Sequence, residues 1–167
     1  MARLASLDDV GLFDSSLIAG EEPELCARMR GKGWKIWRLP GQMATHDMAM
    51  MRFSQWWQRS KRAGYAYAAV YRRANEAGKS HYASEFRRSI AWGLMLPVLI
   101  VGFAAALPYA LVLVAIYPAQ ILRLRIKGAS WPRAFFLVLG KFPEAHGALS
   151  FLWDRVRSTS AKIIEYK

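Results

Sequence analysis

Three acidic side chains stand close together near the amino terminus, where their spacing could support acid–base chemistry. Glu21, Glu22 and Glu24 flank Pro23. Proline and acidic residues are both favoured in the first turn of a helix, and Glu24 has the i,i+4 spacing of an ion pair with Arg28. A carboxylate at the mouth of a site can also take the proton from an attacking hydroxyl group. The spacing alone therefore permits a structural and a catalytic interpretation.

The longer run from Phe13 to Arg28, followed by Gly33-Trp34, resembles the acceptor half of a family 2 glycosyltransferase. The resemblance covers about residues 3 to 70. It implies a GT-A-type fold and transfer of a sugar from a nucleotide-diphospho-sugar to a hydroxyl acceptor. By position it makes Glu22 the catalytic base, in a place where the family usually has Asp. Glu21 would shape the site or bind acceptor hydroxyls.

A second group of candidate residues lies in a predicted helix from Arg52 to about Ala77. The run Gln55 to Arg59 is similar to the Gln-x-x-Arg-Trp motif of membrane-embedded, processive members, although its arginine is one place late and Ser60 replaces the tryptophan. The resemblance implies that this region braces the acceptor and the donor diphosphate. Alternatively, the aromatic stripe could lie at a membrane interface or face an ordinary core. The candidate substrate-binding residues are Gln55, Trp56, Trp57, Arg59 and Arg62.

The resemblance also implies a divalent metal, because related enzymes have a histidine near the position of His46 that helps to hold it. Asp47 is a weaker candidate, and a structural role for His46 is the alternative. Mg²⁺ and Mn²⁺ prefer oxygen ligands, and the chain contains no Asp-x-Asp sequence. We therefore expect at most a fragment of a metal site and no tight cofactor binding by this chain alone.

Only twelve residues precede Phe13, so we expect no room for a nucleotide-binding half. The complete enzyme would need such an N-terminal half, in cis or in trans. We therefore interpret the chain as the C-terminal, acceptor-side portion of a membrane-bound glycosyltransferase that makes a polysaccharide or a glycolipid. The alternative is a non-catalytic membrane adaptor that binds a partner chain or lipid.

An uncharged stretch of 34 residues, from Ser89 to Leu122, indicates membrane insertion. One helix of that length would be about 51 Å long, whereas a bilayer core is about 30 Å thick. We therefore expect a hairpin of two helices, bent near residues 105–108 and kinked at Pro97 and Pro118. The hairpin places the basic residues at both ends of the stretch in the cytoplasm. These residues are Arg87, Arg88, Arg123, Arg125 and Lys127.

The formal net charge of +12 fits an anionic membrane surface. No nucleic-acid-binding motif is present, so we expect membrane lipids and not nucleic acid as partners. The single cysteine, Cys26, excludes an internal disulfide. The predicted location is the cytoplasmic membrane, with the soluble parts facing the cytoplasm.

The sequence predicts a mostly α protein with a short β element: a fragment of an α/β GT-A domain followed by the transmembrane hairpin. A helix opens at Gly20 and stops at Gly31-Lys32-Gly33, and a buried strand covers Trp34–Leu39. A short apolar helix is expected over Ala134–Leu139, and a last amphipathic helix is seeded by Phe151-Leu152-Trp153. The expected regions are 1–51 (acceptor side), 52–88 (amphipathic helix), 89–122 (hairpin) and 123–167 (basic tail with interfacial helices).

Overall fold

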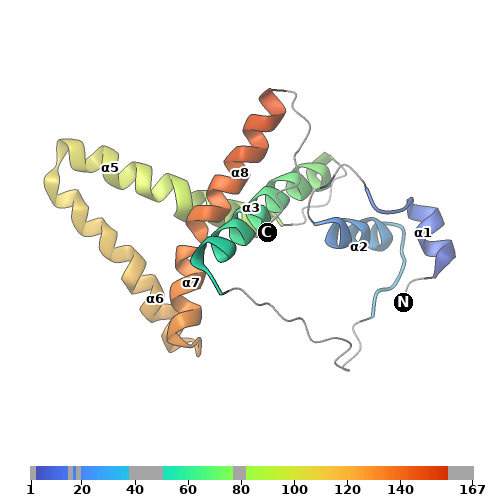
Figure 1. Cartoon of the computed structure of the whole chain (residues 1–167), viewed down its shortest axis with the longest axis horizontal. Coiled ribbons are helices and arrows are strands. Elements are labelled where there is room, and N and C mark those ends of the chain that lie inside the picture. Colours follow the sequence, from blue (N-terminus) through green and yellow to red (C-terminus); the bar gives the residue numbers. More distant parts are fainter. Residues whose placement is uncertain (1–2, 15–16, 18–19, 38–50, 77–81, 158–167) are drawn as a thin grey trace.

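The computed structural model describes residues 3–14, 17, 20–37, 51–76 and 82–157. Within these ranges, every regular element is a helix (Figure 1). In chain order the elements are α1 (Leu4–Val10), α2 (Glu21–Gly31), α3 (Phe53–Glu76), α4 (Ala83–Ile90), the π-helical turn η1 (Ala91–Met95), α5 (Leu96–Ala106), the 3₁₀ helix η2 (Pro108–Ala115), α6 (Ile116–Ile126), α7 (Trp131–Leu139) and α8 (Lys141–Val156).

The packed centre of the molecule is the crossing of α3 with α8, joined by α4 and η1. Glycines allow the backbones to touch at this crossing. A β-carbon on Gly64 would overlap the carbonyl oxygen of Glu144, and one on Gly147 would overlap that of Lys61. Gly93 of η1 meets the Lys141 carbonyl in the same way. Small residues permit such close helix crossings in membrane and soluble bundles alike.

The aromatic stripe of α3 faces this core. The rings of Tyr67 and Tyr82 lie 5.1 Å apart, and Tyr71 stacks on Phe86 of α4 at 5.0 Å between ring centroids. Phe151 of α8 packs edge-on against Tyr65 at 5.3 Å. Of the two interpretations of the stripe, the core-facing one therefore describes these tyrosines.

The uncharged stretch folds as two arms that meet at an extended residue, Leu107. Figure 1 shows α5 and α6 as the arms of an open wedge that projects away from α1 and α2. The predicted bend near residues 105–108 is confirmed. The two arms are held together near their base by the hydroxyl of Tyr117, which donates to the carbonyl oxygen of Trp92 at 2.9 Å.

The first arm runs without a break from α4 through η1 into α5, and it changes hydrogen-bonding pattern just before Pro97. The N–H of Leu96 bonds to the carbonyl of Ala91, which is the wider spacing of a π-helix. Proline has no N–H, so the regular ladder cannot continue through it. On the second arm, Pro118 is the third residue of α6 and lies in its first turn, directly after the 3₁₀ geometry of η2 has changed to α-helix.

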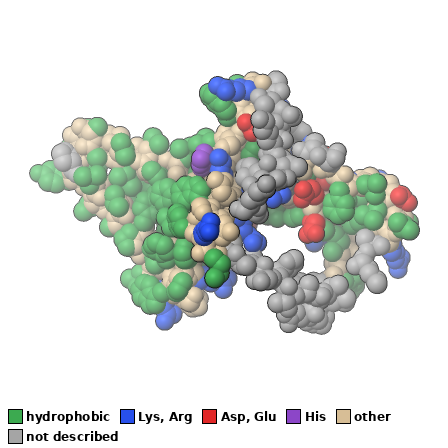
Figure 2. Space-filling view, viewed as in Figure 1, with side chains coloured by type: hydrophobic (Ala, Val, Ile, Leu, Met, Phe, Trp, Pro, Cys, Tyr) green, Lys and Arg blue, Asp and Glu red, His purple; other side chains and the backbone are tan. Residues whose placement is uncertain are grey.

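Two helices in the described part of the chain are long and apolar enough to cross a membrane: Ala83–Ala106 and Tyr109–Ile126. Few of their side chains are covered by the rest of the molecule. Val101, Tyr109 and Val112, for example, are all more than two-thirds exposed. Figure 2 shows hydrophobic side chains covering the wedge, while acidic side chains gather toward α1 and α2.

The predicted buried strand over Trp34–Leu39 is wrong for its described part, residues 34–37. These residues form no ladder with any described segment, and Trp37 is 80% exposed. The indole N–H of Trp34 instead donates to the carboxylate of Asp9 at 2.8 Å, which ties this segment to α1. A strand needs a neighbour to satisfy its backbone, and the described chain offers none.

Candidate functional site

The candidate catalytic acids lie in the first turn of α2, which begins at Glu21, within the predicted start at residues 20–23. Gly20 precedes the helix with a positive φ of 87° and rests on α3, where a β-carbon would lie 3.0 Å from Val70 and 3.5 Å from Ala66. Glu21 is half-buried and Glu22 is exposed. Neither carboxylate makes a hydrogen bond or an ion pair to any described residue. Both are therefore open to a ligand.

Glu24 is used differently from its two neighbours. Its oxygens accept hydrogen bonds from Arg28 at 2.7 and 2.8 Å, which confirms the predicted ion pair. The same guanidinium donates to the carbonyl oxygens of Val10, Gly11 and Leu12, at 2.6 Å for Gly11 and 2.9 Å for Leu12. Glu24 thus holds the arginine that fastens the end of α1 to α2, and its role is structural.

The side chain of Gln55 closes the first turn of α3. Its amide oxygen accepts hydrogen bonds from the backbone N–H groups of Met51 and Arg52, both at 3.1 Å. A glutamine at the third helical position commonly reaches back in this way to unpaired donors at a helix start. Its carbonyl oxygen is thereby occupied within the helix end.

Trp56 and Trp57 belong to an aromatic cluster that reaches from α3 to α7. The ring of Trp56 lies 5.2 Å from Phe53 and 5.0 Å from Phe136 of α7, and 6.5 Å from the ring of Trp57. Both tryptophans are half-buried. Each therefore keeps an exposed part, but the main contacts of Trp56 are with other side chains of the fold.

The structure brings only some of the candidate residues together. Gly20, directly before the acids of α2, lies beside Ala66, and Arg62 lies one turn earlier on α3. Gln55 is eleven residues before Ala66, which is about 16 Å along a helix. Arg59 is exposed between these two positions. The described candidates therefore form a line along α3 and not one compact pocket.

The described residues contain no group of three or more His, Cys, Asp or Glu side chains that could hold a metal ion. His46 and Asp47 lie outside the described residues. The described part of the chain thus does not provide a metal site, and a role for His46 remains a prediction.

A buried polar cluster beside the α3–α8 crossing was not predicted. Ser89 is fully buried, and its hydroxyl lies 2.9 Å from the Glu85 carbonyl and 2.5 Å from the Glu144 carboxylate. Lys141 donates to the same carboxylate at 2.7 Å. Burial first, and then the nearby charge of Glu144, raises the pKa of Tyr67 to about 12, so its phenol stays protonated. The feature of the sequence that could have indicated this buried cluster is Glu144, an isolated acid in a largely apolar segment.

Comparison with known proteins adds no assignment to this geometry: no protein-family model, no curated protein and no solved structure matches the chain.

Proposed function

We propose that the chain is the acceptor-side, C-terminal portion of a membrane-bound family 2 glycosyltransferase. In this proposal the complete enzyme transfers a sugar from a nucleotide-diphospho-sugar to a hydroxyl group of a saccharide or lipid acceptor. One observation carries the proposal: two acids, Glu21 and Glu22, stand open at a helix start that lies away from the apolar hairpin (Figure 1), while the third acid is bound to Arg28.

Glu22 is the proposed general base. Its carboxylate takes the proton from the acceptor hydroxyl as that oxygen attacks the anomeric carbon, and the bond to the nucleotide diphosphate breaks. The exposure of Glu22 supports this role, because an incoming hydroxyl can reach it. Glu21, half-buried beside it, would position the acceptor.

The hairpin is proposed to insert into the cytoplasmic membrane, with the acids and both basic flanks on the cytoplasmic side. The exposed apolar surface of the two arms supports insertion, because a water-facing surface of that extent is unfavourable. The excess of Lys and Arg at the base of the hairpin supports the orientation.

The donor side is proposed to come from an N-terminal half, in cis or in trans. The 167 residues contain no Asp-x-Asp sequence, and the described acids and histidine form no metal site. A divalent metal, Mg²⁺ or Mn²⁺, would then be held mainly by that other half. The basic side chains Arg59 and Arg62 are the candidates in this chain for contact with the diphosphate.

The direct test is Glu22→Gln in the complete enzyme. Amide replacement removes the base and keeps the size of the side chain, so sugar transfer should fall about 10²- to 10⁴-fold while donor binding stays nearly unchanged. Transfer is measured with radiolabelled donor and donor affinity by calorimetry. Asp8→Asn removes an exposed carboxylate from α1 and serves as the control, with transfer at the wild-type rate. Wild-type transfer by Glu22→Gln would end the assignment.

A non-catalytic membrane adaptor is the second candidate. The uses of Gln55 as a helix cap and of Trp56 in the aromatic cluster with Phe136 favour it, since both residues then serve the fold. The two functions differ in their dependence on the acids. An adaptor would bind its partner equally well with Gln at positions 21 and 22, as measured by co-purification.

A further inference from the structure

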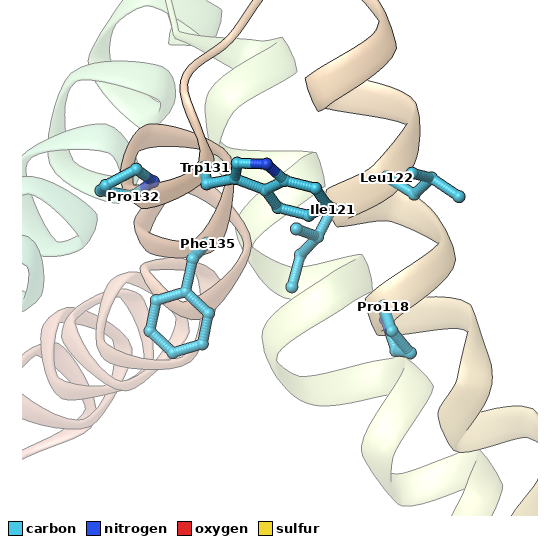
Figure 3. A pocket seen from close by; sticks show the side chains of 6 residues that line it. All are labelled: Pro118, Ile121, Leu122, Trp131, Pro132 and Phe135. Atoms are coloured by element: carbon cyan, nitrogen blue, oxygen red, sulfur yellow. The ribbon is translucent and has the colours of Figure 1, made fainter.

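An apolar groove lies between α6 and α7, at the base of the second arm of the hairpin. It has a volume of about 600 Å³ and is lined by Pro118, Ile121, Leu122, Trp131, Pro132 and Phe135. Figure 3 shows the indole of Trp131 extending from α7 toward Ile121 on α6. No lining side chain is charged, so the groove suits a hydrocarbon ligand and excludes one whose polar groups would lose their hydrogen bonds.

A cation, Arg125, lies at one end of this groove. The guanidinium carbon of Arg125 is 6.0 Å from the centre of the Trp131 ring. Arg125 follows Pro118, Ile121 and Leu122 at helical spacing, so it shares their face of α6. From Pro118 to Arg125 the groove face extends about 10 Å along the helix axis. An apolar lining that ends at a positive charge is complementary to an acyl chain that ends at a negatively charged phosphate.

We propose that this groove binds one acyl chain of an anionic phospholipid from the bilayer, with the lipid phosphate beside Arg125. The proposal rests on insertion of the hairpin and not on sugar transfer. None of the residues in Tyr109–Ile126 is buried by the rest of the molecule, so the groove opens onto a surface that lipid would cover. Trp131, 57% exposed, would lie at headgroup depth, which tryptophan prefers.

The test uses the full chain in phosphatidylcholine vesicles that contain a minor fraction of a lipid brominated in its acyl chains. The probe lipid is either phosphatidylglycerol or phosphatidylcholine. Bromine quenches tryptophan fluorescence at short range, and the part due to Trp131 is the difference between the wild type and Trp131→Phe. We expect the anionic lipid to quench that part about fivefold more effectively, which corresponds to about 1 kcal/mol for one arginine near an anionic lipid.

Two variants with the same charge separate a lipid site from general surface attraction. Arg125→Gln should bring the ratio of the two lipids close to one. Arg123→Gln removes an exposed arginine from another face of α6 and should keep the wild-type ratio. Equal loss in both variants would overturn the proposal, because it would show attraction to the membrane surface alone. Ile121→Phe fills the groove and should reduce quenching by both lipids.

Two further results would also overturn the lipid site. A second copy of the chain seated in the groove would shield Trp131 from both brominated lipids. Extraction of the chain from the vesicles by alkaline carbonate would show that the hairpin is not inserted. No step of the assay needs sugar transfer. The quenching results therefore test the lipid site even if the chain proves not to belong to a glycosyltransferase.

Discussion

The three neighbouring acids in α2 differ in their contacts. Glu24 is turned toward Arg28, whose guanidinium also binds three successive carbonyl oxygens at the end of α1. Glu21 and Glu22 remain open at the start of the same helix. Glu24 therefore serves as part of a tether, and Glu21 and Glu22 are the two acids available for the proposed proton transfer.

Arg28→Lys tests the tether. A lysine ammonium lacks the planar fork that reaches Glu24 and the α1 carbonyls together. We expect the opening of α1 to become easier by about 1–2 kcal/mol, since hydrogen bonds to charged groups contribute on this order when partly exposed. The measurement is native-state hydrogen exchange of the amides in Leu4–Val10. Arg30→Lys, at an exposed position of α2, is the matched control. Equal exchange in both variants would contradict the tether.

Among the helices, the crossing of α3 and α8 has the closest backbone approach described. Gly64 and Gly147 face each other's helices with no room for a side chain. This contact joins the helix that carries Trp56 and Trp57 to α8, the second helix after the apolar hairpin.

Gly64→Ala tests the crossing. The added methyl group must push the two helices apart, and overpacking of this kind costs about 1–3 kcal/mol of the free energy of unfolding. Gly102→Ala is the matched control, because a β-carbon at Gly102 meets nothing within 4 Å. That change should stabilise α5 by up to about 1 kcal/mol through helix propensity. Thermal unfolding in detergent compares the two, and equal midpoints would show that the crossing is looser than described.

Helix boundaries were predictable where local signals were strong. The limits of α2 and α3 and the bend at residues 105–108 follow from caps, periodicity and proline. The start of α8 was not predictable, because in the sequence Gly140, Pro143 and Gly147 indicate breaks in a helix. In the structure Pro143 occupies the first turn, which needs no N–H donor, and Gly147 meets α3. Tertiary contact decides such positions, and a single sequence does not contain it.

The candidate site was predictable in its acids and not in its assembly. Glu21 and Glu22 lie at a helix start, as expected, and Glu24 pairs with Arg28. The use of Gln55 as a cap depends on where α3 begins. The distance between the acids and the tryptophans depends on how α2 docks on α3, which periodicity does not specify.

The molecule as a whole divides into an apolar wedge and a charged, packed body (Figure 2). The body holds the acids, the α3–α8 crossing and the first basic flank, and the wedge projects from it, with the second basic flank at the end of α6. A hairpin with basic residues at its base and none along its arms leaves both ends on one side of a membrane. The proposed sugar transfer at the cytoplasmic face and the proposed lipid binding in the α6–α7 groove both depend on this topology.

Cysteine labelling measures that topology most directly. Single cysteines are placed at Ser84 and at Ser130, on either side of the hairpin, in a Cys26→Ser background. A third probe at Tyr109, next to the bend and 88% exposed, is the control for the opposite side. We expect a membrane-impermeant maleimide to label positions 84 and 130 from the cytoplasmic side and position 109 only from the other. Labelling of positions 84 and 130 from opposite sides would contradict the hairpin and the functions that depend on it.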